Sequence, residues 1–137
     1  MKSILAVDDD RWILETLTDA LATKGYEVLT SNSADQALGV LRSRTVDLVL
    51  IDLQMPGKDG FELYRELFAV QDVPVLFVSG CSRSFSPKSA GFTDLWTQHF
   101  SLGQTDILYK PFRLVSLFEK VEALIGKAEV EANGQGQ

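Results

Sequence analysis

The sequence predicts an α/β fold, a doubly wound sheet of five parallel strands with helices between them, and two observations carry this prediction. Short apolar runs without polar alternation recur along the chain, which is typical of parallel strands buried on both faces. Between these runs, apolar residues repeat at helical spacing. Strands that alternate with helices form parallel sheets, and right-handed crossovers then place helices on both faces.

The elements follow in order along the chain. The first strand is expected at 4–7, and the helix after it begins near Asp10, a good N-cap residue, and stops at Gly25. A second helix begins after Ser33. The other strands are expected at 26–30, 46–51, 73–78 and 107–109, and the other helices at 61–68, 92–100 and 114–125.

Length, composition and charge limit the function classes. The 137 residues suffice for one domain with a sizeable core, and 45% of them are hydrophobic. The formal charge is 13 − 19 = −6, which argues against direct nucleic-acid binding. No apolar stretch approaches the roughly 18 residues of a membrane span, and no signal peptide precedes the first strand. Cys81 is the only cysteine, so a cytoplasmic location is expected.

Acidic side chains follow two of the expected strands. Asp8, Asp9 and Asp10 follow the first strand, and Asp52 ends the third. Because ligands of open α/β sheets bind outside the carboxyl ends of the strands, we expect these carboxylates to meet at one rim. Like charges so close together require a cation, and Mg²⁺ prefers oxygen ligands. We assign Asp10 to capping its helix and the other three aspartates to a Mg²⁺ site.

Short motifs stand in order at the carboxyl ends of four expected strands. They are Asp8-Asp9, Asp52, Met55-Pro56-Gly57-Lys58-Asp59-Gly60, Ser79-Gly80 and Lys110-Pro111-Phe112. Each motif alone is weak, but the ordered set over residues 2–126 resembles the receiver domain of bacterial two-component response regulators. The resemblance implies a flavodoxin-like sheet with strand order 2-1-3-4-5. It also implies a receiver domain, which we expect over residues 1–128, and the polar, Gly-rich composition of 129–137 predicts a flexible tail.

The resemblance further implies a phosphoryl-transfer chemistry. Asp52 would attack a phosphoryl group carried on a histidine of a sensor kinase or a phosphotransfer protein. Asp9, Asp52 and the backbone carbonyl of Gln54 would bind Mg²⁺ directly, and Asp8 would act mainly through water on the ion. The chain would not be an enzyme acting on a separate substrate, because it would catalyse only its own phosphorylation and dephosphorylation.

The same resemblance implies roles for two more side chains and for partner proteins. Lys110, expected to precede a cis peptide bond, would hold a phosphoryl oxygen, and Ser79 would donate its hydroxyl and move inward on phosphorylation. The phosphorylated form would change its affinity for a downstream effector protein, with no membrane or nucleic-acid contact. A homodimer through the helix at 92–100, the strand at 107–109 and the last helix is left open. We expect a stand-alone receiver, because few residues follow Ile125.

Two features depart from the usual receiver pattern. Ile107 stands where an aromatic residue usually precedes the lysine by three positions, and Tyr109 does not simply replace it. The stretch from Ser79 to Lys110 is longer than usual, with the extra residues at about 81–91. We therefore hypothesise that output uses an altered loop and the helix at 92–100. Amide chemical shifts of residues 80–100 that do not change with a phosphoryl mimic would contradict this hypothesis.

Three other kinds of protein would require residues or explain features that differ from those of a phosphorylated receiver. A degenerate receiver, an interaction module that is never phosphorylated, would explain the unusual Ile107 but not the complete set of site residues. A phosphohydrolase of the haloacid dehalogenase type needs a second carboxylate two residues after the nucleophile, where Gln54 stands. A flavodoxin needs a phosphate-binding loop after the first strand, where three aspartates would repel the phosphate of FMN. The only histidine, His99, is expected on a helix surface or in packing, and the two tryptophans, Trp12 and Trp96, are expected in the core or at an interface.

Overall fold

The computed structural model describes residues 1–53, 60–79 and 104–127, without the side chains of Phe61 and Ser79. In this part of the chain the strands are β1 (Ser3–Val7), β2 (Glu27–Ser31), β3 (Leu48–Asp52), β4 (Val75–Ser79) and β5 (Thr105–Tyr109). The helices are α1 (Arg11–Thr23), α2 (Ala34–Ser43), α3 (Gly60–Phe68) and α5 (Leu114–Ile125). The expected helix at 92–100, the extra residues at 81–91 and the tail at 129–137 lie outside the described residues. Within them, no helix combines the length and apolarity needed to cross a bilayer.

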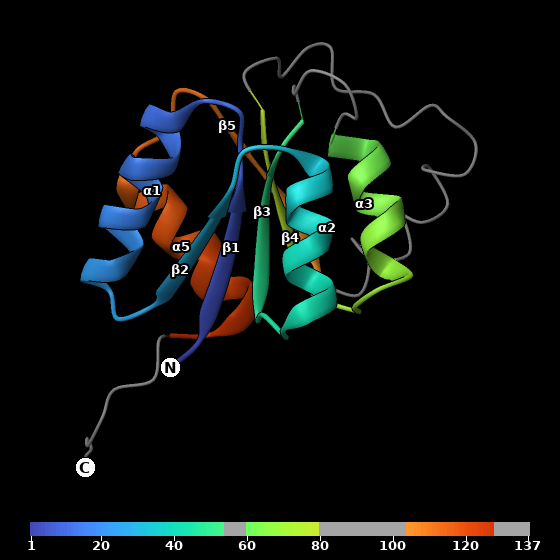
Figure 1. The fold of residues 1–137 in the computed structure, drawn as a ribbon. Coiled ribbons are helices and arrows are strands. Elements are labelled where there is room, and N and C mark those ends of the chain that lie inside the picture. Colours follow the sequence, from blue (N-terminus) through green and yellow to red (C-terminus); the bar gives the residue numbers. More distant parts are fainter. Residues whose placement is uncertain (54–59, 80–103, 128–137) are drawn as a thin grey trace.

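The strands form one parallel sheet in the order β2-β1-β3-β4-β5, as predicted (Figure 1). Val7 of β1 pairs with Ile51 of β3, so Asp8 and Asp52 leave adjacent strands at the same level. Ser79 of β4 pairs with Tyr109 of β5 in the same way. The motif residues that follow or end these strands therefore share the carboxyl rim of the sheet.

Helices cover both faces of the sheet, with α1 and α5 on one side and α2 and α3 on the other (Figure 1). Successive residues of a strand point to opposite faces, so Ile4 and Ala6 pack against α1 and α5. Leu5 and Val7 pack against α2 and α3. This double burial is the physical reason why the strands are continuously apolar. Ile107 is 9% exposed and joins the core on the α2 and α3 face.

The predicted start and end of α1 and the predicted start of α2 are confirmed by the residues that cap them. The side chain of Asp10 accepts hydrogen bonds from the backbone N–H groups of Trp12 (2.9 Å) and Ile13 (3.4 Å). Ser33 accepts one from the N–H of Gln36 at 3.2 Å. Gly25 follows the last turn of α1 with a φ of 92°, a conformation that favours glycine. Trp12 is 68% exposed, which excludes a core role for its side chain.

Gln71, in the segment between α3 and β4, joins three parts of the chain through one side chain. Its Oε1 atom accepts from the N–H of Val46 at 2.8 Å. Its amide nitrogen donates to the carbonyls of Leu41 and Arg44, both at 3.0 Å. Gln71 thus satisfies backbone groups where α2 ends and the chain turns into β3.

Gln71→Ala is expected to lower the free energy of unfolding by about 2–3 kcal/mol, because two partly buried backbone groups and one exposed backbone group lose their partner. Gln36→Ala is the matched control, since Gln36 accepts one exposed hydrogen bond from Asn32 and should cost less than about 1 kcal/mol. Urea unfolding measures both values, provided that the dependence of the free energy of unfolding on urea concentration is the same in each variant. Equal losses in the two variants would contradict the proposed importance of Gln71.

Candidate functional site

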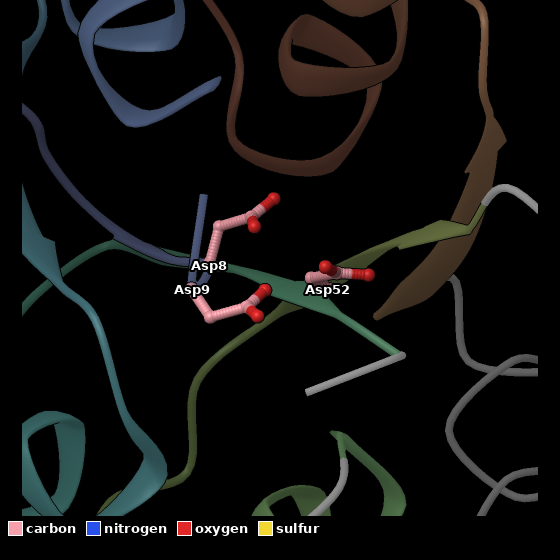
Figure 2. Close-up of side chains that lie close together, drawn as sticks. All are labelled: Asp8, Asp9 and Asp52. Atoms are coloured by element: carbon pink, nitrogen blue, oxygen red, sulfur yellow. The ribbon is translucent and has the colours of Figure 1, made fainter. Parts of the chain in front are cut away.

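Three carboxyl groups come together at the rim of the sheet. Asp8, Asp9 and Asp52 each offer an oxygen atom within 4.8 Å of the others, and Figure 2 shows the three side chains at the ends of β1 and β3. Asp8 and Asp52 are buried, with 2% and 5% of their surface exposed, whereas Asp9 is exposed. The expectation that the carboxylates of the two strand ends meet at one rim is therefore confirmed.

The backbone around the cluster fixes the position of Asp8. Its N–H donates to the carbonyl of Ser31 at the end of β2, at 3.1 Å. Its Oδ1 atom accepts from the N–H of Asp10 at 2.9 Å. Neither contact is predictable from the sequence, because a backbone carbonyl and a backbone N–H carry no residue-specific signal.

Lys110 supplies the positive charge that faces the cluster in the described part of the chain. Its Nζ atom lies 3.5 Å from Oδ2 of Asp8 and 3.7 Å from Oδ2 of Asp52. The peptide bond between Lys110 and Pro111 is cis, as the resemblance implied. One ammonium group thus contacts two members of a cluster of three carboxyl groups, which leaves the site with excess negative charge.

Burial and the neighbouring charges both shift the pKa of Asp8. Burial raises the pKa of Asp8 from its ordinary value of 3.8 to about 6. The nearby carboxylate of Asp52 contributes to this rise, whereas the N–H of Asp10 and the ammonium of Lys110 oppose it. The ionised form of Asp8 is therefore disfavoured unless more positive charge enters the site.

The donor set fits a hard divalent cation such as Mg²⁺. All three side chains offer carboxylate oxygen, the ligand type that Mg²⁺ prefers, and a cation would remove the charge excess. Of the residues predicted for the site, the structure brings together Asp8, Asp9, Asp52 and Lys110. Gln54 and the rest of the loop at 54–59 lie outside the described residues, as does the side chain of Ser79.

The chain is similar in sequence to several response regulators. Response regulator RR06 of Streptococcus pneumoniae is 32% identical over 123 residues, which are 90% of this chain and 52% of that protein. Response regulator MprA of Mycobacterium leprae is 34% identical over 127 residues, 92% of this chain and 52% of the relative. The chain thus spans about half the length of the curated relatives it matches.

A solved structure extends this similarity to the fold. Response regulator protein TrrA of Thermotoga maritima, in complex with Mg(2+)-BeF, is 32% identical and superposes with a TM-score of 0.74. The similarity covers 90% of this chain and 99% of that one. Residues 4–122 match the family described as the response regulator receiver domain. By this match over most of its length, the chain belongs to the family of receiver domains of two-component response regulators.

Proposed function

We propose that this receiver accepts a phosphoryl group on Asp52, releases it by hydrolysis, and signals through a changed affinity for an effector protein. The donor would be a phosphohistidine on a sensor kinase or a phosphotransfer protein in the cytoplasm. The receiver would span residues 1–128. The observation that supports this proposal best is the nearly buried carboxylate of Asp52, with an ammonium 3.7 Å away and two more carboxyl groups beside it.

The transfer step uses the carboxylate of Asp52 as a nucleophile. One of its oxygens would bond to phosphorus while the bond from phosphorus to the histidine nitrogen breaks, and the leaving imidazole would keep that electron pair. The ammonium of Lys110 would hold one phosphoryl oxygen, and the hydroxyl of Ser79 would donate a hydrogen bond to another. Both contacts would strengthen as charge develops on the phosphoryl oxygens.

Asp8, Asp9, Asp52 and the backbone carbonyl of Gln54 would hold Mg²⁺. When bound, the ion supplies positive charge that neutralises the phosphoryl oxygens, which three carboxyl groups would otherwise repel. The exposed position of Asp9 leaves the cluster open on the rim side, where a donor has to approach. The two buried carboxylates then define the inner wall of the site.

Asp52→Asn is expected to abolish phosphoryl uptake. The full chain is exposed to a small phosphodonor with Mg²⁺, and mass spectrometry of the intact protein detects one added phosphoryl group. Wild type should gain this mass, and omission of Mg²⁺ should prevent the gain. Asp35→Asn, which removes an equal charge from the exposed first turn of α2, should react like wild type.

The same measurement separates the proposal from the second function class. A wild-type chain that never gains phosphoryl mass, while binding the same partners, would be a degenerate receiver. Addition of the mass to Asp52→Asn would move the acceptor to another residue and contradict the proposed site.

A further inference from the structure

We propose that Asp10 is a positioning residue of the Mg²⁺ site, because its capping side chain holds its own backbone N–H against the carboxylate of Asp8. This inference rests on the proposed function, since it concerns the ion that the receiver would hold. Asp10 would not touch the ion or the phosphoryl group. It would act through Asp8.

Asp10 connects the first turn of α1 with the acidic cluster. On the helix side, its Oδ1 atom accepts from the N–H of Trp12 at 2.9 Å and from that of Ile13 at 3.4 Å. Its carbonyl accepts from the N–H of Leu14 at 3.1 Å. On the cluster side, its N–H donates to Oδ1 of Asp8 at 2.9 Å. The direction of that N–H is therefore set by the helix cap.

The contact from Asp10, at 2.9 Å, is shorter than the contact that Lys110 makes with the carboxyl group of Asp8. The ammonium of Lys110 lies 3.5 Å from Oδ2. A lysine side chain has many rotatable bonds, whereas a backbone N–H at a capped helix start has a fixed direction. The capped N–H therefore does more than Lys110 to hold Asp8 in one orientation.

The structure also separates Asp10 from the ligands themselves. Among the described residues, the carboxyl groups within 4.8 Å of one another are those of Asp8, Asp9 and Asp52, and Asp10 is not one of them. Its side chain is exposed and already accepts from two helix N–H groups. Loss of a hydrogen bond that orients a metal ligand, from a group that does not itself bind the ion, typically lowers metal affinity by about 10–100-fold.

Three substitutions distinguish a positioning role from a role of charge or of stability. Asp10→Ala removes both the cap and the charge, whereas Asp10→Asn removes the charge and keeps the cap, because asparagine caps equally well. Ser33→Ala removes the cap of α2, which has no hydrogen bond to the cluster, at a similar cost of about 1 kcal/mol in folding free energy. Calorimetry with Mg²⁺ and hydrogen exchange of the amide of residue 10 are measured on the full chain.

Asp10→Ala is expected to weaken Mg²⁺ binding by about tenfold and to speed exchange of the amide of residue 10. Asp10→Asn and Ser33→Ala are expected to keep both properties within about twofold of wild type. If Asp10→Asn binds Mg²⁺ as weakly as Asp10→Ala does, the loss of charge explains the effect and the proposal is overturned. If Ser33→Ala binds Mg²⁺ as weakly as Asp10→Ala does, general loss of stability explains the effect and the proposal is overturned.

The exchange measurement keeps this inference distinct from the proposed function. If wild type binds no Mg²⁺ and accepts no phosphoryl group, the proposed function fails, whatever the variants do. If wild type does both and Asp10→Ala matches it in affinity and amide exchange, only the positioning role fails.

Discussion

Asp8→Asn is expected to raise the free energy of unfolding of the metal-free protein by about 1–3 kcal/mol at about pH 7.5, although it removes a proposed metal ligand. Asp8 is only 2% exposed, and burial raises its pKa to about 6. The gap from the ordinary value of 3.8 corresponds to an upper limit of about 3 kcal/mol for ionising this group in the folded state. Loss of the contact with Lys110 offsets part of the gain.

The dependence of the free energy of unfolding on pH shows in which direction Asp8 changes stability. Because the pKa of Asp8 is higher in the folded than in the unfolded state, the folded state binds the proton more tightly. The stability that this group contributes is fully present below about pH 4 and is lost as the pH rises through about 6. The advantage of Asp8→Asn over wild type should therefore shrink as the pH falls from about 7.5 toward 4.

Urea unfolding at several pH values, with a chelator present, measures this difference. Asp19→Asn is the control, because it removes an equal charge from an exposed position of α1 and should change stability by less than about 0.5 kcal/mol. Mg²⁺ should reduce the advantage of Asp8→Asn over wild type. Wild type would gain about 2.7 kcal/mol at a Mg²⁺ concentration of 100 times its dissociation constant, and a tenfold weaker variant about 1.4 kcal/mol less. A variant less stable than wild type without the ion would contradict the account.

Lys110→Met is expected to act in the opposite direction and to lower the free energy of unfolding of the metal-free protein by about 2–3 kcal/mol. Its ammonium lies within 4 Å of both Asp8 and Asp52, whose side chains are 3% and 6% exposed. Removing it leaves buried carboxylates without their cation, which costs more than the ion pair itself was worth. Mg²⁺ should restore much of the loss, because it supplies positive charge to the same groups.

Lys120→Met provides a matched control on α5. Lys120 pairs with Asp106 at 3.1 Å, but both side chains are about one-third exposed, so its loss should cost less than about 1 kcal/mol. In a double-mutant cycle, Lys110→Met should cost at least about 0.5 kcal/mol less when Asp8 is already asparagine, since the two residues are in contact. Equal costs for the two lysines, or strict additivity in the cycle, would count against the proposed electrostatics.

Most element positions were predictable because they depend on neighbours within a few residues. The helix at 114–125 coincides with the prediction, and the caps at Asp10 and Ser33 are those expected. Strand ends differ because pairing, rather than pattern, defines a strand. Val46 was predicted inside a strand, but its N–H donates to the side chain of Gln71, and β3 begins at Leu48.

The site was predictable only in part. The acidic strand ends and the ordered motifs predicted the convergence of Asp8, Asp9, Asp52 and Lys110. No sequence pattern predicted that Asp8 would be buried enough to raise its pKa, or that one backbone N–H would orient it. The burial of Asp8 and its contact with the N–H of Asp10 follow from the packing of α1 and β2 around the end of β1. A local residue pattern does not predict such packing.

By itself, the sequence determined the apolar strands, the capped helices and the supply of carboxylates at the strand ends. Each of these depends on hydrogen bonds or periodicity over a short stretch of chain. Only the tertiary structure decided how Asp8 and Lys110, 102 positions apart, come into contact, and how one ammonium comes to face two members of a cluster of three carboxyl groups. That balance arises from strand pairing and burial, because charges interact strongly only where the fold removes the water between them.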